Sequence, residues 1–374
     1  MIPSQVWIEE LTRRRHDLWQ AAETEGCDLL LVYATTEHAE AFRYLTNFVP
    51  SLGDMWGVMT GPDQMDCYLN FHWELLEARS ISGLDGWQGI LNPVPAVMAR
   101  IRETAPRRMA VLGWQRLPWT AYRRLTEENP GIQMVDLGGH LDQIRRIKSP
   151  LEIELLKEGA RITDMAFSEI RELVRPGVTE NEIAAQVLYA FRREGAGLAF
   201  DPLVMGGLDA ETAVMARSTR PRPLESGDSL LIDIGAACTG YQVDVSRTLV
   251  LGEPNPLQRK IWDTIQEAYE AVVSLARPGV PCVHLHQVAE GIINNAGFEL
   301  KHRIGHGIGL ATSFEWPSLD VETAPLQPGM TIAVEPGVYE VGAGAMKLED
   351  SLVITDTGCE VISTCSRALA PTLA

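Results

Sequence analysis

Residues 302–309 read His-Arg-Ile-Gly-His-Gly-Ile-Gly and place one imidazole, His306, between closely spaced glycines. Glycine has no Cβ, so a segment of this kind lets other backbone approach the histidine closely. Two acidic motifs follow along the chain, Val-Glu-Pro-Gly at 334–337 and Leu-Glu-Asp at 348–350. This stretch therefore predicts a crowded site that gathers one histidine and at least two carboxylates.

Two further acidic residues precede this stretch. Asp233 lies in Leu-Leu-Ile-Asp-Ile-Gly (230–235), and Asp244 ends Tyr-Gln-Val-Asp (241–244). A strand, a tight turn at Thr239-Gly240 and a returning strand would bring the two carboxylates onto facing positions.

Asp233 and Asp244, together with Glu335, Glu349 and His306, form a hard, oxygen-rich set of candidate metal ligands. Such a set can hold two divalent ions a few Å apart and activate the water between them. Four carboxylates without cations would repel one another strongly, so metal binding is favoured over a purely structural acid cluster. Mn, Fe, Co and Zn all suit these ligands.

The composition bounds the class of protein. A chain of 374 residues is long enough for two domains, and its net charge of −18 argues against nucleic acid or an anionic membrane as partners. The six cysteines include no CxxC pair and are expected to be free thiols. We find neither a signal peptide at the N-terminus nor an apolar run of the ~20 residues needed to cross a bilayer. The expected location is the cytoplasm.

Secondary-structure signals predict an α/β chain of two domains. In the first half, residues 9–26 have helical spacing, 28–33 and 109–113 read as strands, and 58–69 as a β-hairpin. Near 145–150 a boundary is expected, because Ser149, Pro150 and Glu152 form a capping box that opens a long helix.

Further helices are predicted in the second half, after Thr179, after Asn255 and over 284–296. Within the long helix, Ile153, Leu156, Ala160, Ile162 and Ala166 are predicted to face inward. The strands expected between the helices are 229–234, 241–251, 330–335 and 350–355.

The motifs in this order resemble those of the creatinase/prolidase/aminopeptidase P superfamily, the M24 or pita-bread metallohydrolases. Besides the five ligand motifs, the resemblance rests on 26–28, 44–48, 145–153 and the segment 302–309. It implies a small creatinase-like N-terminal α/β domain at 1–148 and an α+β pita-bread catalytic domain at 149–374.

The resemblance also implies roles for the site residues. Asp244 and Glu349 would bridge two ions, Asp233 would complete one ion, and His306 and Glu335 the other. Glu335 would in addition carry a proton during catalysis. A homodimer is implied as well, and Trp56 is a candidate for a residue that reaches the partner's site.

The chain departs from the family pattern at three places. Residues 205–217 lack an expected histidine, Phe314 stands where another is usual, and Lys347 replaces an arginine. The missing histidines would donate hydrogen bonds to the substrate and the intermediate. Arg217, Tyr241 and Lys347 are therefore candidate substrate-binding residues, and Phe314 is a candidate pocket wall.

The complete ligand set favours a dinuclear metal-dependent hydrolase that cleaves an amide or other C–N bond of a small molecule or short peptide. The missing histidines favour a specialised non-peptidase substrate. The alternative is a Xaa-Pro dipeptidase or aminopeptidase. A metal-dependent lyase and a non-catalytic pita-bread binding module are the further alternatives.

Overall fold

The computed structural model describes residues 4–310 and 315–369, which fall into two compact units. The first unit comprises Met1–Arg145 and the second Arg146–Ala374. The sequence placed the boundary between residues 148 and 149.

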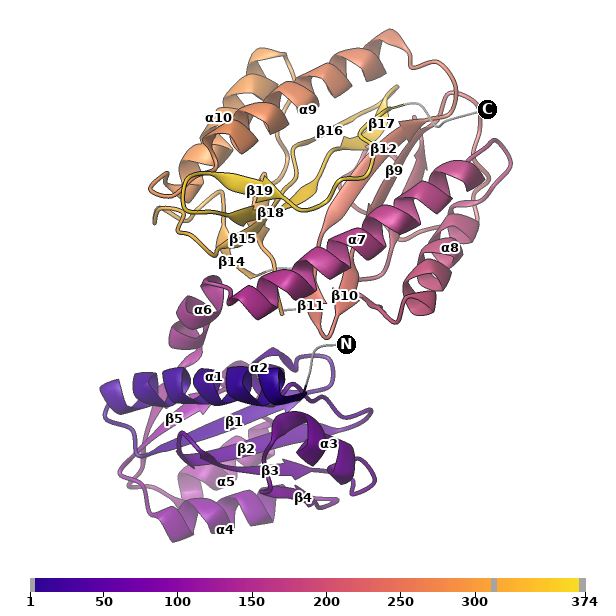
Figure 1. Ribbon diagram of the computed structural model, residues 1–374. Coiled ribbons are helices and arrows are strands. Elements are labelled where there is room, and N and C mark those ends of the chain that lie inside the picture. Colours follow the sequence, from indigo (N-terminus) through magenta and orange to yellow (C-terminus); the bar gives the residue numbers. More distant parts are fainter. Residues whose placement is uncertain (1–3, 311–314, 370–374) are drawn as a thin grey trace. The chain divides into compact units, whose positions relative to one another are not determined.

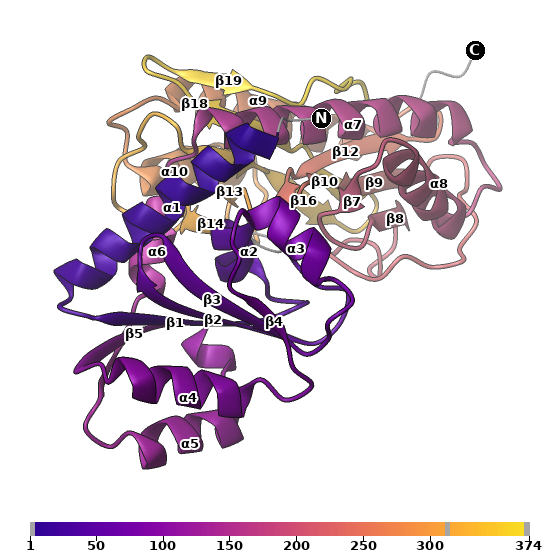
Figure 2. The same ribbon diagram turned by 60° about the horizontal axis from the view of Figure 1, so that its bottom comes forward.

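The N-terminal unit is built on one mixed sheet (Figures 1 and 2). Its strand order is β4-β3-β2-β1-β5-β6, in which β1 pairs antiparallel with β2 and parallel with β5. The strands are β1 (Leu29–Thr35), β2 (Asp54–Gly61), β3 (Gln64–Leu69), β4 (Trp87–Gly89), β5 (Arg108–Leu112) and β6 (Gln133–Asp136).

Helices cover both faces of this sheet (Figure 2). One face carries α1 (Ser4–Thr24), α2 (Glu40–Thr46) and α3 (Leu75–Ser82), and the other α4 (Val94–Thr104) and α5 (Trp119–Glu128). A short 3-10 turn at Trp114–Arg116 and helix α6 (Gly138–Arg146) complete the elements of this region. The two-sided cover explains why β1 reads as a continuous apolar run, since all of Leu29 to Ala34 is buried.

The second unit contains two pairs of helices, each packed on its own group of strands (Figure 1). The first pair is α7 (Pro150–Leu173) and α8 (Glu180–Arg193), and the second is α9 (Pro256–Leu275) and α10 (Cys282–Asn295). Capping boxes open α7 at Ser149, α8 at Thr179 and α9 at Asn255, which confirms the predicted helix starts. Each cap satisfies backbone N–H groups that would otherwise lack partners.

Two antiparallel sheets form the centre of this unit. The first has the order β12-β9-β8 and the second β14-β13-β15-β18-β19. A backbone bridge between Ser246 and Glu349 joins them. The strands are β8 (Leu203–Gly207), β9 (Ser229–Ile234), β12 (Val245–Val250), β13 (Gly305–Gly307), β14 (Glu315–Ser318), β15 (Thr331–Val334), β18 (Asp350–Ile354) and β19 (Cys359–Val361).

Smaller strands complete the unit. A hairpin is formed by β16 (Gly337–Glu340) and β17 (Gly344–Lys347). A further small sheet contains β7 (Gly197–Leu198), β10 (Ala236–Cys238) and β11 (Tyr241–Gln242). The predicted single strand 241–251 is therefore wrong, because the chain leaves one sheet after β11 and enters another at β12. Asp244 lies in that break.

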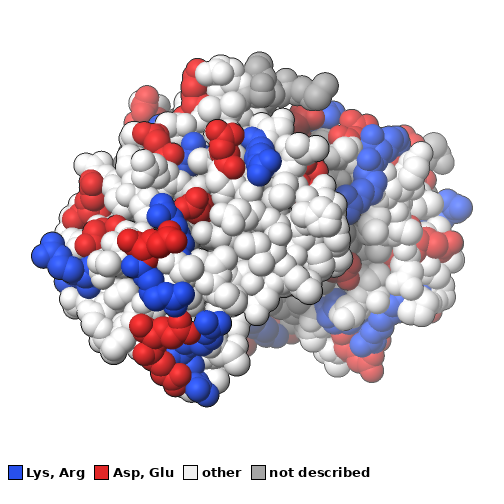
Figure 3. Space-filling model, turned by 90° about the horizontal axis from the view of Figure 1, so that it is seen from below, with Lys and Arg blue, Asp and Glu red and all other residues white. Residues whose placement is uncertain are grey.

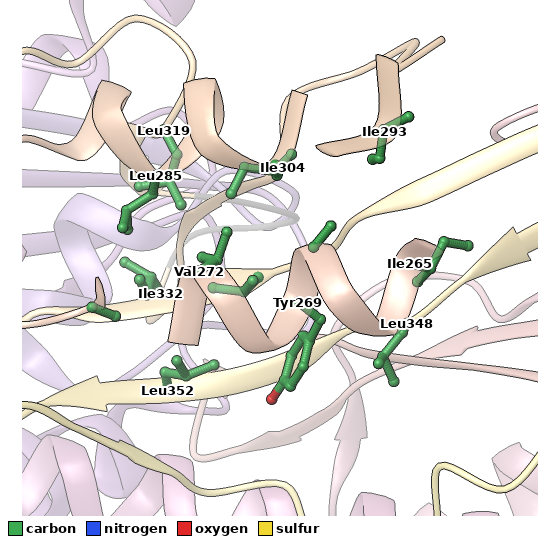
Figure 4. Close-up of a cluster of buried hydrophobic side chains, with 14 of the residues drawn as sticks. Ile265, Tyr269, Val272, Leu285, Ile293, Ile304, Leu319, Ile332, Leu348 and Leu352 are labelled. Atoms are coloured by element: carbon green, nitrogen blue, oxygen red, sulfur yellow. The ribbon is translucent and has the colours of Figure 1, made fainter. Parts of the chain in front are cut away.

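The core beneath α9 and α10 is apolar and fully enclosed (Figure 4). Burying each aliphatic side chain contributes about 1.5–3 kcal/mol. This core therefore holds β15 and β18 in place, next to which Glu335 and Glu349 lie. Labelled members are Ile265, Tyr269, Val272, Leu285, Ile293, Ile304, Leu319, Ile332, Leu348 and Leu352. In α7, four of the five residues predicted to face inward are buried, whereas Ile153 is only half-buried and its place is taken by Leu155.

Charged side chains of both signs are interspersed on the face seen in Figure 3. That face presents no continuous basic surface of the kind that attracts a phosphate backbone. Among the described helices, none combines the length and the apolar character that crossing a bilayer would require.

Candidate metal centre

The two aspartates are brought together by the turn that the sequence predicted. Thr239 and Gly240 both have positive φ, 51° and 85°, and reverse the chain between β10 and β11. Strand β12 then runs antiparallel to β9, with Ser246 opposite Asp233. Asp244 directly precedes β12, so it lies beside Asp233 at the end of the sheet.

His306 occupies the middle of β13, between β14 and β15. A Cβ at Gly305 would lie 2.2 Å from the carbonyl oxygen of Ala333, and one at Gly307 would lie 2.6 Å from that of Trp316. Only glycine fits at such distances, which confirms the predicted close approach of backbone around this histidine. The ring Nδ1 lies 2.9 Å from the Gly307 carbonyl, so it carries the hydrogen and leaves Nε2 with its lone pair toward the acids.

Glu335 and Glu349 lie where strands end. Glu335 follows β15, and Pro336 turns the chain before β16 begins. Glu349 lies between β17 and β18, and its backbone N–H donates to the Ser246 carbonyl at 3.1 Å. The Ser246 hydroxyl also donates to Glu349 Oε2 at 2.7 Å. The five predicted ligands thus come from separate elements of one unit.

The five side chains converge and are buried. His306 Nε2 is 3.5 Å from Asp244 Oδ2 and 3.7 Å from Glu335 Oε1. Ligand atoms of Asp244, His306 and Glu349 all lie within 4.8 Å of one another, a spacing that one metal ion can bridge. Asp233 is connected to this group through Lys347.

Lys347 lies inside the acidic cluster rather than at its rim. Its ammonium is 2.8 Å from Asp233 Oδ2, 2.9 Å from Glu349 Oε2 and 3.1 Å from Glu335 Oε2. Burial disfavours the charged form, but the three carboxylates outweigh it and hold the Lys347 pKa well above its usual value. The lysine therefore stands in the protein as a fixed positive charge.

The remaining oxygens suit a metal ion. Among the described residues, Asp233 Oδ1, Asp244 Oδ1 and Glu349 Oε1 are buried and accept no hydrogen bond from the protein. Burial, together with the neighbouring Glu349 and Asp233, raises the pKa of Asp244 well above its usual value. A bound cation would satisfy these oxygens and remove the repulsion between them. The residues present thus fit at least one divalent ion.

The cluster opens into a cavity of about 620 Å³. Besides four of the predicted ligands and Lys347, its lining contains Phe200, Asp201, Leu203, Met215, Ala216, His302, Arg303 and Asp320. Met215 and Ala216 lie in the segment where the family's histidine is absent, so an apolar surface takes the place of that donor. This volume is in the range of small-molecule sites.

His302 and Arg303 were not identified as site residues from the sequence. The signal for them was their position at the head of the 302–309 motif. His302 Nδ1 lies 2.6 Å from the Arg303 carbonyl and therefore carries the hydrogen, so Nε2 accepts from the Tyr339 hydroxyl at 2.8 Å. Burial lowers the His302 pKa and keeps the ring neutral. Arg303 adds a cationic group to the cavity wall.

The other candidate substrate residues lie elsewhere. Trp56 is a core residue of the N-terminal unit, 1% exposed and packed on Tyr33. Arg217 forms an ion pair with the buried Glu180. The Tyr241 hydroxyl donates to Glu152, the capping residue of α7, at 2.7 Å. None of these three is among the described residues that line the cavity. Phe314 lies outside the described residues.

Comparison with known sequences gives a consistent result. The model of metallopeptidase family M24 matches residues 154–356. A Xaa-Pro dipeptidase from Pyrococcus furiosus is 34% identical over 61% of this chain, and the match spans 66% of that relative, just under two thirds of its length. The uncharacterized peptidase YqhT of Bacillus subtilis is 32% identical over 90% of this chain and 94% of its own.

Solved structures share the fold of the whole chain. The prolidase of Pyrococcus horikoshii has a TM-score of 0.86 at 25% identity, and the match covers 96% of this chain and 99% of that one. The X-Pro aminopeptidase of Thermotoga maritima has a TM-score of 0.87 at 26% identity, with the same coverage. These likenesses confirm the predicted fold class, a two-domain chain with a pita-bread C-terminal domain.

Proposed function

Because the chain belongs to metallopeptidase family M24, we propose that it is a metal-dependent hydrolase that cleaves short peptides of the Xaa-Pro type. The observation that carries this proposal is that Asp244, His306 and Glu335 line one cavity. Ligand atoms of Asp244, His306 and Glu349 lie within 4.8 Å of one another, and buried oxygens of Asp244 and Glu349 have no hydrogen-bond partner. Relatives named Xaa-Pro dipeptidase support the peptide substrate. This reverses the ranking drawn from the sequence, which put a specialised non-peptidase substrate first.

The metal ligands in this proposal are Asp233, Asp244, His306, Glu335 and Glu349. When bound, a divalent ion of the Mn, Fe, Co or Zn type would acidify water and polarise the scissile carbonyl. The sequence predicted two such ions, the number that the family pattern implies. The homodimer and the cytoplasmic location likewise stay predictions.

The chain's own groups have distinct tasks in this scheme. The family resemblance implies that Glu335 moves the proton, and we keep that role in the proposal. Its Oε1 lies 3.7 Å from His306 Nε2, and its Oε2 lies 3.1 Å from Lys347 Nζ. Burial raises the Glu335 pKa, but the Lys347 ammonium outweighs this effect and lowers the pKa to about 2, so the carboxylate is ionised at neutral pH. Arg303 in the cavity wall is suited to bind a substrate carboxylate. The apolar side chains of the wall are suited to contact an apolar ring of the substrate; they are Phe200, Leu203 and Met215.

The missing histidine favours a second candidate, a small-molecule amide that needs no donor from the segment around Met215. Steady-state hydrolysis of Ala-Pro, Ala-Ala and the amide Ala-NH₂ by metal-loaded protein separates the two. We expect kcat/KM for Ala-Pro to reach at least the ordinary enzyme range of ~10⁴ M⁻¹s⁻¹ and to exceed that for Ala-Ala. If Ala-Pro is not hydrolysed with any of the metals tested, the result would contradict the peptidase proposal.

A further inference from the structure

One wall of the cavity belongs to a long loop, residues 208–228, which joins β8 to β9 and contains neither a helix nor a strand. Met215 and Ala216 of this loop line the cavity, and both are exposed, Met215 to 50%. Exposed side chains have few packing contacts to hold them in place. The position of this part of the wall therefore depends on attachments that the loop makes elsewhere.

The main attachment is to Glu180, the first residue of α8. Its side chain is fully buried, and each carboxylate oxygen accepts two hydrogen bonds. Arg217 Nη2 lies 2.5 Å from Oε1 and Nη1 lies 2.8 Å from Oε2, which is a bidentate pair. The backbone N–H of Gly206 donates to Oε1 and that of Arg220 to Oε2, both at 2.9 Å. Glu180 thus joins α8, strand β8 and the loop.

Arg217 is the link between Glu180 and the cavity wall. It directly follows Ala216, and its side chain is only 8% exposed. A bidentate pair fixes the orientation of the guanidinium as well as its distance, because both hydrogen bonds must be formed together. If the two wall residues shifted away from the cavity, Arg217 would separate from Glu180 and leave a buried carboxylate without its charged partner.

Thr219 attaches the loop at a second point. Its hydroxyl donates to the Pro202 carbonyl at 2.8 Å and accepts from the Val204 backbone N–H at 3.1 Å. Leu203, which lies between those two residues, also lines the cavity. The loop is therefore joined to the start of β8 next to the cavity, and the two together form this side of the wall.

We propose that Glu180, through Arg217, positions Met215 and Ala216 as an apolar wall against the ring of a Xaa-Pro substrate. Glu180 then determines how tightly the ring is bound, although it does not touch the substrate. This inference rests on the proposed function for the nature of the substrate. It gives Arg217 a positioning role in place of the substrate contact that the sequence predicted.

The proposal predicts an effect on substrate binding rather than on the chemical step. Glutamine at position 180 keeps the size of the side chain but has one acceptor oxygen in place of two, so it cannot hold both Arg217 and the two backbone N–H groups. The wall then loses its fixed distance from the ring. A contact to a part of the substrate that does not react stabilises the ground state and the transition state alike, so its loss raises KM and leaves kcat unchanged.

The test is the separate measurement of kcat and KM for Ala-Pro with metal-loaded protein. Glu180→Gln and Met215→Ala are each expected to raise KM by about 10-fold with kcat within about twofold of wild type, the low end of what one methylene contributes in an apolar pocket. Arg217→Lys keeps the charge without the bidentate geometry and is expected to raise KM by a smaller factor. Elemental analysis should give the same metal content for all of these proteins.

Glu211→Gln is the matched control. It makes the same change in the same loop, but the Glu211 side chain is 73% exposed and pairs with the exposed Arg220. Both kinetic constants should stay near wild type in this variant. Circular dichroism checks the fold of each protein. If Glu180→Gln does not fold, Arg217→Lys tests the positioning role, and Met215→Ala tests the wall without disturbing a buried group.

The outcomes separate this inference from the proposed function. An unchanged KM in Met215→Ala would overturn the apolar wall, and an unchanged KM in the folded Glu180 or Arg217 variant would overturn the positioning role. A fall in kcat without a rise in KM would also contradict the inference. In these cases hydrolysis of Ala-Pro by wild type leaves the proposed function intact. If wild type hydrolyses no Ala-Pro with any metal, both are overturned.

Discussion

Asp244→Asn is expected to remove the bound ion and to lower kcat/KM for Ala-Pro by at least about 10²–10³-fold, the loss usual when one preorganised stabilising group is removed from an active site. Asparagine keeps the size of the side chain but supplies a neutral oxygen in place of a carboxylate. Asp244 Oδ1 is buried without a hydrogen-bond partner, so no protein contact is lost at that atom. The backbone N–H of Asp244 donates to Ser351 at 3.1 Å and is retained in the variant.

Kinetics and elemental analysis on the same preparation check this result. Asp263→Asn is the matched control, because it makes the same change on an exposed position of α9 and should leave both quantities near wild type. An Asp244→Asn protein that keeps its metal and more than about a tenth of the activity would contradict the assignment of this residue.

Asp350→Asn is expected to lower the free energy of unfolding by about 3–5 kcal/mol, the cost of removing one partner from a buried ion pair. Asp350 is fully buried and accepts from Arg247 at 2.6 Å, Ser363 at 2.7 Å and Arg367 at 3.0 Å. Arg247 is 1% exposed, so loss of the carboxylate leaves a guanidinium charge with little water around it. Glu349 directly precedes Asp350, so this ion pair also anchors the start of β18 beside a proposed metal ligand.

Urea unfolding of metal-free protein measures the effect without a contribution from bound metal. The control is Asp356→Asn, the same change on an exposed residue beyond the end of β18, where a change within about 0.5 kcal/mol is expected. A loss below about 1 kcal/mol in Asp350→Asn would show that the buried pair contributes little to stability.

Local sequence signals predicted most of the fold. The capping boxes at Ser149, Thr179 and Asn255 are formed by residues three positions apart, so their geometry depends only on the nearby chain. The turn at Thr239-Gly240 was likewise predicted from the local sequence. It also predicted that Asp233 and Asp244 lie on facing positions. The break between β11 and β12 was missed, because an apolar run does not reveal that two sheets share it.

The features that remained hidden depend on long-range packing. The position of Lys347 inside the carboxylate cluster arises from contacts with Asp233, which is 114 residues away in the sequence. The tyrosine at 241 looked available for a substrate, but its hydroxyl is bound by Glu152 of α7, 89 residues away. The ring of His302, at the cavity wall, forms a hydrogen bond with the Tyr339 hydroxyl, which is 37 residues away in the sequence. No pattern of hydrophobic spacing or charge reports such contacts.

The most direct test of the proposed function is the initial rate of Ala-Pro hydrolysis as Mn²⁺, Co²⁺, Zn²⁺ or Fe²⁺ is added back to chelator-treated protein. We expect the metal-free protein to be inactive and the rate to rise with added ion until the site is filled, because the carboxylates around His306 need a cation to act on water. Full activity in protein shown by elemental analysis to contain no metal would contradict the account, as would no activity with any of the four ions.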